Sequence, residues 1–175
     1  MTNFNLFVYG TLMSDFRSPY HFQDDLDFSK ATINGNLYHY THFPMISIPS
    51  GNKGTIGSCN YAKDMEIQED ACKTKAPYAW DNSFGNVMGE LYTLPFDENT
   101  IRRLDMYEGF NAQSPSKSLY NRYLVPVTTI YGNITWAWVY SATKIPRCCI
   151  PVPSGNWLDC FTQDLCDLKE EYQRR

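Results

Sequence analysis

Phe7-Val-Tyr-Gly-Thr-Leu-Met13 is the stretch of this sequence from which the rest of the chain is best interpreted. The apolar run that reaches Tyr9 predicts a strand that ends at Gly10 and opens into a tight loop carrying Thr11. Glycine has no Cβ atom, so the backbone at Gly10 can approach a ligand closely and present free N–H groups to a carboxylate or carbonyl oxygen. The stretch is therefore either a cradle for such a ligand or an ordinary turn at the end of a strand.

The composition indicates one folded domain over residues 1–175, because 43% of the residues are hydrophobic and 15% are aromatic. Lys and Arg number 15 against 19 Asp and Glu, which gives a net charge of −4 and no basic block that could follow a phosphate backbone. No stretch approaches the roughly 20 apolar residues of a membrane span. We expect a cytoplasmic protein with no nucleic-acid or membrane partner.

Six cysteines raise the question of a disulfide framework or a metal site. None of them forms a Cys-x-x-Cys pair, and no secretory context accompanies them. His39 and His42 have a spacing that suits metal binding on a helix, but the residues around them predict a strand. We therefore expect free thiols, no metal and no cofactor.

Strand signals dominate the chain. Residues 35–38 and 43–48 predict two extended pieces with a bend near Pro44, and we expect both to join the first strand in one sheet. Residues 87–94 predict another strand, in which Gly89 marks a bulge or a close approach. Residues 119–130 and 134–140 predict an antiparallel hairpin.

Helix signals are fewer. Asp97 is a good N-cap, Ile101 and Leu104 lie on one face, and Gly109 predicts the end of the helix, which places Glu108 in its last turn. Trp157 and the apolar residues after it have helical spacing and predict a C-terminal helix over about 156–172 that packs on the sheet. The expected fold is α+β: a small mixed or antiparallel β-barrel, closed or strongly curled, with flanking helices.

Residues 51–86 show no sustained period of either kind. A loop of this length in a compact domain usually has a function or a structure of its own. The segment is either an insertion that acts as a lid or a surface excursion with a short helix near Ile67–Cys72.

Glu108 is the acidic residue whose position in the sequence best suits proton transfer. A carboxylate at the C-terminus of a helix faces the negative end of the helix dipole, which raises its pKa, and burial between Tyr107 and Phe110 would raise it further. Such a glutamate can transfer protons near neutral pH. The alternative is an exposed glutamate at a helix end.

Taken in order, several motifs resemble those of the gamma-glutamylcyclotransferase-like family. The resemblance spans most of the chain and is greatest for the branch of gamma-glutamylamine cyclotransferases and the enzyme that removes a gamma-glutamyl group in butirosin biosynthesis. The motifs are Phe7-Val-Tyr-Gly-Thr-Leu12, Gly35-x-Leu-Tyr38, Phe43-Pro44, Val87-x-Gly-Glu-Leu-Tyr92, Leu104-Asp-x-Tyr-Glu-Gly109, Tyr120-x-Arg122, Ala137-Trp-Val-Tyr140 and Ser154-Gly-Asn-Trp157.

The resemblance implies a small β-barrel whose cavity binds a gamma-glutamyl group through Tyr9, Gly10, Thr11 and Leu12, with Glu108 as the acid–base residue. It also implies the reaction. The α-amine of a gamma-glutamyl amide attacks its own γ-carbonyl carbon, which releases 5-oxoproline and an amine, so the enzyme needs no nucleophile. The alternative is a non-catalytic module that binds the same ligand on the same fold.

Arg122 has two interpretations. It can hold the α-carboxylate of the substrate, or it can pair with a buried acid such as Asp105, since arginine is the usual partner of buried carboxylates. Asp105 itself is expected to be structural.

Overall fold

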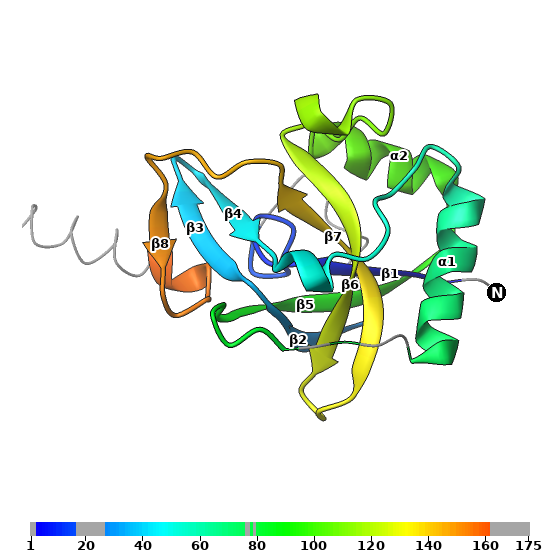
Figure 1. Cartoon of the computed structure of the whole chain (residues 1–175), viewed down its shortest axis with the longest axis horizontal. Coiled ribbons are helices and arrows are strands. Elements are labelled where there is room, and N and C mark those ends of the chain that lie inside the picture. Colours follow the sequence, from blue (N-terminus) through cyan, green and yellow to red (C-terminus); the bar gives the residue numbers. More distant parts are fainter. Residues whose placement is uncertain (1–2, 17–26, 76–77, 79, 162–175) are drawn as a thin grey trace, which may run out of the picture.

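The protein folds around a closed five-stranded barrel, seen in a computed structural model that describes residues 3–16, 27–75, 78 and 80–161 (Figure 1). The strand order around the barrel is β1-β5-β2-β6-β7. All pairs are antiparallel except β1 with β7, which run parallel and close the barrel. The α+β barrel expected from the sequence is confirmed. The barrel strands are β1 (Asn3–Val8), β2 (Phe28–Asn34), β5 (Asn86–Pro95), β6 (Tyr120–Thr129) and β7 (Ile134–Ala142).

A second, smaller sheet lies beside the barrel. Its order is β4-β3-β8, with β3 (Asn36–Tyr40), β4 (Phe43–Ser47) and β8 (Ile150–Val152). The expectation that residues 35–48 join the first strand in one sheet is therefore wrong. The reversal between β3 and β4 also lies at Thr41, whose φ is 51°, and not at Pro44. Pro44 fits within β4 because β4 is an edge strand, where a missing N–H removes no ladder hydrogen bond.

The hairpin and the strand at 87–94 are confirmed. β6 and β7 pair from Tyr120 with Ala142 to Thr128 with Ile134. At Gly89 in β5, a Cβ atom would collide with the Val8 carbonyl and would lie 2.7 Å from the Phe7 ring. Gly89 is thus a close-approach point that lets β1 lie against β5.

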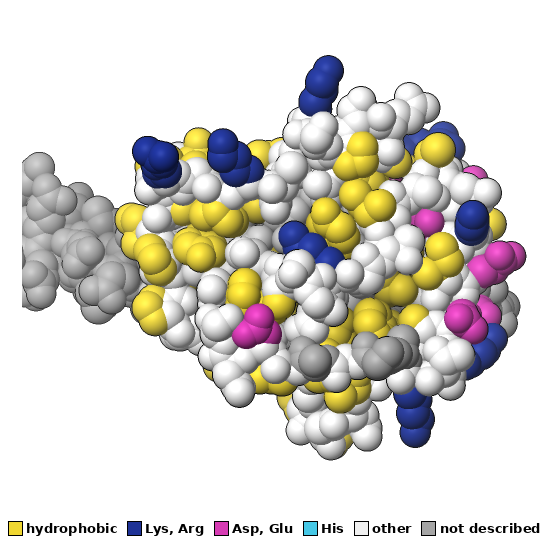
Figure 2. Space-filling model, in the orientation of Figure 1, with side chains coloured by type: hydrophobic (Ala, Val, Ile, Leu, Met, Phe, Trp, Pro, Cys, Tyr) yellow, Lys and Arg dark blue, Asp and Glu magenta, His cyan; other side chains and the backbone are white. Residues whose placement is uncertain are grey.

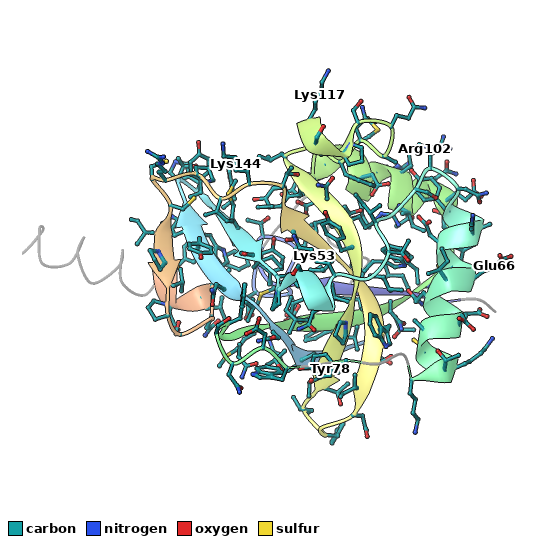
Figure 3. All side chains as sticks on the ribbon, viewed as in Figure 1. Lys53, Glu66, Tyr78, Arg102, Lys117 and Lys144 are labelled. Atoms are coloured by element: carbon teal, nitrogen blue, oxygen red, sulfur yellow. The ribbon has the colours of Figure 1, made fainter. Side chains whose placement is uncertain are left out.

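Residues 51–86 contain a short 3₁₀ turn at Ser50–Asn52 and a 14-residue helix, α1 (Tyr61–Thr74), which is longer than expected. The Asn60 side chain accepts a hydrogen bond from the Lys63 N–H and begins this helix. Buried Tyr61 and Met65 belong to the core that includes strands β1 and β7. The outer face of α1 carries acidic side chains, which gather at the right in Figure 2, and Glu66 points into solvent in Figure 3.

Helix α2 (Glu98–Tyr107) begins and ends as the sequence predicts. The Asp97 side chain accepts hydrogen bonds from the N–H groups of Asn99 and Thr100. Gly109 has a φ of 65°, and the Phe110 N–H donates to the Asp105 carbonyl at 2.8 Å, which is a Schellman C-cap. A 3₁₀ turn, Pro115–Lys117, follows α2. None of the described helices is both long and apolar enough to span a membrane.

The C-terminal helix begins at Leu158, and its predicted continuation to 172 lies outside the described residues after Phe161. Trp157, just before it, is 1% exposed and makes an edge contact with the His39 ring of β3. In Figure 1 this end of the chain and the small sheet lie on one side of the barrel, opposite α1.

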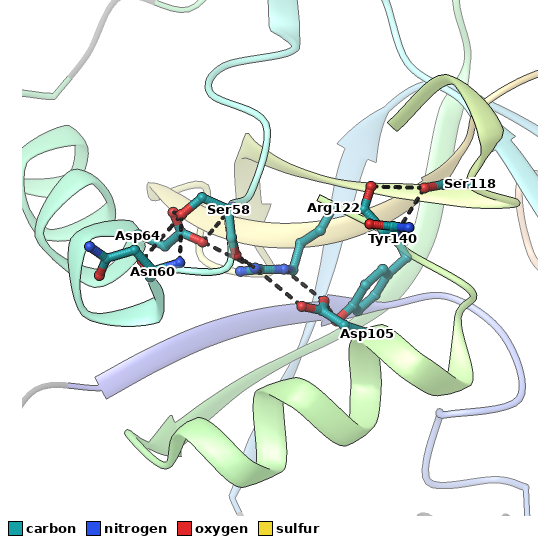
Figure 4. A network of polar contacts seen from close by, with 8 residues as sticks. Ser58, Asn60, Asp64, Asp105, Ser118, Arg122 and Tyr140 are labelled. Atoms are coloured by element: carbon teal, nitrogen blue, oxygen red, sulfur yellow. Dashed lines mark hydrogen bonds and ion pairs between the residues drawn. The ribbon is translucent and has the colours of Figure 1, made fainter. Parts of the chain in front are cut away.

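A buried polar cluster joins the helices to the barrel (Figure 4). Arg122 on β6 is 0% exposed, and its Nε lies 2.9 Å from Asp105 Oδ1 of α2 while its Nη2 lies 3.0 Å from Asp64 Oδ2 of α1. Nη2 also donates to the Ser58 carbonyl. The Tyr140 hydroxyl of β7 donates to Asp105 at 2.7 Å. Aromatic rings surround the guanidinium: Phe4, Tyr61, Phe110 and Trp138.

Replacing Arg122 should destabilise the whole domain. Arg122→Met leaves two carboxylates buried without their cation, and breaking such a buried pair costs about 3–5 kcal/mol. Urea unfolding at pH 7 measures the loss. Arg103→Met, at an exposed position of the same helix that carries Asp105, should change the free energy of unfolding by less than about 0.5 kcal/mol. Wild-type stability in Arg122→Met would show that the cluster does not hold the fold together.

Candidate active site

A cavity of about 240 Å³ opens where the end of β1, the start of β4, the end of α2 and the two strands β6 and β7 meet. It brings together five residues that the sequence assigns to a site: Tyr9, Gly10, Thr11, Leu12 and Glu108. The remaining walls are mostly apolar or aromatic: Phe7, Val8, Phe43, Pro44, Tyr107, Leu119, Tyr120 and Tyr140.

The loop after β1 is a tight turn, closed by a hydrogen bond from the Met13 N–H to the Gly10 carbonyl at 2.8 Å. A side chain at residue 10 would collide with the Pro44 ring, so glycine is required there for the contact between this loop and β4. Among the described residues, the N–H groups of Gly10, Thr11 and Leu12 have no hydrogen-bond acceptor. Three unused donors on the wall of a cavity suit an anionic or carbonyl oxygen.

Three of the four tyrosines that line the cavity, Tyr9, Tyr120 and Tyr140, donate their hydroxyl protons to other protein groups. Tyr9 donates to the Tyr140 carbonyl at 2.6 Å, Tyr120 donates to the Pro44 carbonyl at 2.7 Å, and Tyr140 donates to Asp105. Burial raises the pKa of all three hydroxyls well above the usual value, so they remain protonated. Their role is to hold the cavity walls together.

Glu108 is the C-cap residue of α2, and the Schellman turn at Gly109 determines its position. Burial raises the pKa of its carboxyl from the ordinary 4.5 to about 8, and the nearby Asp105 carboxylate contributes to the increase. Thr11 and Tyr107 lie with their hydroxyl oxygens 3.3 Å apart, which ties the β1 loop to the residue before Glu108. The cavity thus holds one acid that can change its protonation state near neutral pH.

Arg122 does not reach this cavity. Its guanidinium is buried in the cluster with Asp64 and Asp105, which is the second of the two interpretations drawn from the sequence. The structure therefore places Arg122 apart from Tyr9, Gly10, Thr11, Leu12 and Glu108, which line the cavity. Residues 51–86 do not reach the cavity either, since none of the described residues in that range lines it.

Glu90 was not singled out from the sequence, although it lies in the motif around β5. It is 0% exposed and accepts hydrogen bonds from the Ser14 N–H, the Ser14 hydroxyl, the Lys30 ammonium and the Tyr92 hydroxyl, at 2.6 to 3.0 Å. Burial raises the pKa of Glu90, but these donors outweigh it and hold the pKa below the usual value. Because Ser14 directly follows the turn at 10–13, Glu90 anchors the far end of the loop after β1, which we call the binding loop because the sequence predicts that it binds a ligand.

Within the described ranges, no group of three His, Cys, Asp or Glu side chains is arranged to bind a metal ion. The thiols of Cys59, Cys72, Cys148 and Cys149 form no disulfide.

The sequence profile described as "Gamma-glutamyl cyclotransferase, AIG2-like" matches residues 59–159. The chain belongs to this family. The matched region begins two residues before α1 and includes Glu108. The loop after β1 lies outside the matched region, on its N-terminal side. No curated protein matches the sequence significantly.

Solved structures with similar folds have low sequence identity to this AIG2-like chain. YkqA from Bacillus subtilis is 22% identical with a TM-score of 0.51, over 89% of this chain and 39% of the Bacillus chain. This chain therefore spans well under half the length of that protein. A protein from Arabidopsis thaliana is 14% identical with a TM-score of 0.51, over 99% of this chain and 93% of that one. An AIG2-like protein from Mus musculus is 19% identical with a TM-score of 0.48, over 83% of this chain and 82% of that one.

Glu90→Gln should loosen the binding loop and destabilise the fold. A hydrogen-bonded, buried carboxylate contributes about 1.5–3 kcal/mol, so we expect a loss in that range at pH 7 in urea unfolding. The pKa of Glu90 is depressed in the folded state, so this contribution is present above the unfolded pKa and lost as the pH falls through the folded value. The difference from wild type should therefore shrink below about pH 4. A difference that does not depend on pH would contradict an ionised Glu90.

Glu108→Gln should have the opposite pH dependence. Folded Glu108 keeps its proton up to about pH 8, whereas the unfolded chain releases it near 4.5, so wild-type stability falls as the pH rises through this window. Glutamine has no proton to lose. The variant should gain stability relative to wild type between pH 5 and 8. We expect a gain of about 1–2 kcal/mol, less than the full pKa shift implies, because Glu108 is partly exposed and solvent screens its interactions.

Glu66 offers the matched control for both variants, because it is an exposed glutamate on α1. Thermal or urea unfolding of Glu66→Gln should differ little from wild type at any pH between 5 and 8. If the stability of Glu108→Gln relative to wild type does not change with pH, as expected for Glu66→Gln, then the pKa of Glu108 is not raised in the folded protein.

Proposed function

We propose that the protein is a gamma-glutamyl amide cyclotransferase that converts its substrate to 5-oxoproline and a free amine. The observation that carries the proposal is the cavity that Glu108 shares with the loop Tyr9 to Leu12. Membership of the gamma-glutamyl cyclotransferase, AIG2-like family supports the reaction class.

In this reaction Glu108 acts as the proton carrier. Its carboxylate takes a proton from the α-ammonium group, and the freed amine attacks the γ-carbonyl carbon to close a five-membered ring. The C–N bond of the amide then breaks as Glu108 returns this proton to the leaving nitrogen. The second proton of the attacking nitrogen follows through the same carboxylate, so that the products are 5-oxoproline with a neutral ring N–H and the amine as an ammonium ion. An ammonium group has a pKa of about 8 or above, so a carboxyl with a pKa of about 8 exchanges protons with it at little cost.

The oxygen atoms of the substrate require hydrogen-bond donors. No Lys, Arg or His is among the described residues that line the cavity, and the hydroxyls of Tyr9, Tyr120 and Tyr140 donate to protein oxygens. We therefore assign the α-carboxylate and the developing oxyanion to the N–H groups of Gly10, Thr11 and Leu12. Proximity contributes the rest, because well-oriented intramolecular reactions reach effective molarities of ~10⁵ M or more.

The second candidate is a binding module without turnover, in which the same cavity holds a gamma-glutamyl group. The free N–H donors favour this candidate as much as the enzyme, because they account for binding without any proton transfer. Product formation separates the two candidates.

The experiment is to incubate the protein with a set of gamma-glutamyl amides and to measure 5-oxoproline. We expect release by wild type and a loss of kcat/KM of at least about 100-fold in Glu108→Gln, the usual contribution of general acid–base catalysis. Glu66→Gln should retain wild-type activity. Substrate binding should persist in Glu108→Gln, measured by calorimetry. Undiminished activity in Glu108→Gln would exclude Glu108 as the proton carrier, and binding without 5-oxoproline in wild type would favour the module.

A further inference from the structure

The outer wall of the cavity is apolar. Phe43 at the start of β4, Tyr107 at the end of α2 and Leu119 before β6 all line it, and they are 37%, 40% and 49% exposed. Phe7 and Val8 line the same cavity but are only 1% and 3% exposed. Phe43, Tyr107 and Leu119 therefore form the rim of the cavity, and Phe7 and Val8 of β1 form its floor.

The rim offers no partner for a charge. Among the 13 described residues that line the cavity, Glu108 is the one with an acidic or basic side chain; its carboxyl has a pKa of about 8 and is assigned to proton transfer. Lys117, two residues before Leu119, points away from the protein body in Figure 3. Arg122 is held by Asp64 and Asp105 in the buried cluster. A charged leaving group would lose water at this rim without gaining an ion pair.

The position of the rim identifies which part of the substrate it meets. The free N–H donors of the loop and Glu108 take the α-carboxylate, the α-amine and the γ-carbonyl oxygen, so the rest of the cavity is left for the group beyond the amide nitrogen. An apolar group there would cover Phe43, Tyr107 and Leu119, and the burial of apolar surface favours its binding.

We propose that the cavity selects gamma-glutamyl amides of uncharged, apolar amines, aromatic or branched aliphatic, over those of amino acids or diamines. This inference rests on the proposed function and names the substrate class of the same site. The rim residues come from three separate elements, so its apolar character is a property of the assembled fold and not of one segment.

The test compares kcat/KM for 5-oxoproline release from four substrates. Gamma-glutamyl benzylamide and gamma-glutamyl isobutylamide are neutral beyond the amide, gamma-glutamyl glycine carries a carboxylate, and the monoamide of 1,4-diaminobutane carries an ammonium group. We expect the neutral amides to exceed both charged ones by at least about tenfold. Equal rates, or a preference for a charged amide, would overturn this inference and leave the cyclotransferase proposal intact. No 5-oxoproline from any of the four would instead count against the cyclotransferase proposal itself.

A variant of the rim tests the contact directly. Leu119→Lys places a cation beside the leaving group and should improve the use of gamma-glutamyl glycine relative to the benzylamide by about two- to fivefold, the range of a partly exposed ion pair. The matched control is Ile130→Lys, at a residue that is 63% exposed after β6 and does not line the cavity. It should leave the ratio unchanged. An unchanged ratio in folded Leu119→Lys, checked by its melting curve, would show that Leu119 does not meet the amine.

Discussion

The buried guanidinium of Arg122 is the constraint on which the rest of the structure depends. It lies on β6, and its partners come from α1, α2 and the segment before α1, while Tyr140 of β7 completes the cluster through Asp105. One cation thus sets the positions of two helices against two barrel strands. The cluster contains one more carboxylate than it has cations, and the excess negative charge lies three residues from Glu108. Asp105, which secures α2 through this cluster, therefore also raises the pKa of Glu108, in addition to the larger effect of burial.

The cavity has a clear separation between structural and reactive groups. The hydroxyls of Tyr9, Tyr120 and Tyr140 donate to the Tyr140 carbonyl, the Pro44 carbonyl and the Asp105 carboxylate, so their protons hold strands and helix together. Glu90 does the same for the segment after the binding loop. The polar groups that remain on the cavity wall are the backbone N–H groups of Gly10, Thr11 and Leu12, the paired hydroxyls of Thr11 and Tyr107, and the carboxyl of Glu108.

Local signals in the sequence predicted much of the fold. The caps of α2 at Asp97 and Gly109 and the β6–β7 hairpin are determined by residues near them in the chain. Gly89 indicated a close approach by its residue type alone, although the residues that it meets, Phe7 and Val8, are distant in the sequence. The division of the strands between two sheets was not predictable in this way, because β3 could pair with either sheet and its partner β8 lies more than 100 residues later. Glu90 was missed for a related reason: its partner Ser14 is 76 residues away.

For the site, the sequence brought out Glu108 and the β1 loop, but it left Arg122 between two interpretations. A pattern in the chain shows which residue types are present, whereas the role of a charge depends on what surrounds it. Asp64, the second acid that holds Arg122, lies on a helix that showed no clear period. The Asp64 side chain reaches Arg122 only when α1 packs on the barrel.

The parallel pairing of β1 with β7 has a consequence for how the protein acquires its cavity. Tyr9, just after β1, donates a hydrogen bond to the carbonyl of Tyr140 in β7, 131 residues later, and this bond links the same two parts of the chain whose pairing closes the barrel. Bringing such distant segments together costs chain entropy, and proteins rich in such contacts fold slowly. A chain emerging from the ribosome holds its binding loop from the start but has no opposite wall until β7 has been made. The cavity is therefore completed late, in the same step that finishes the barrel.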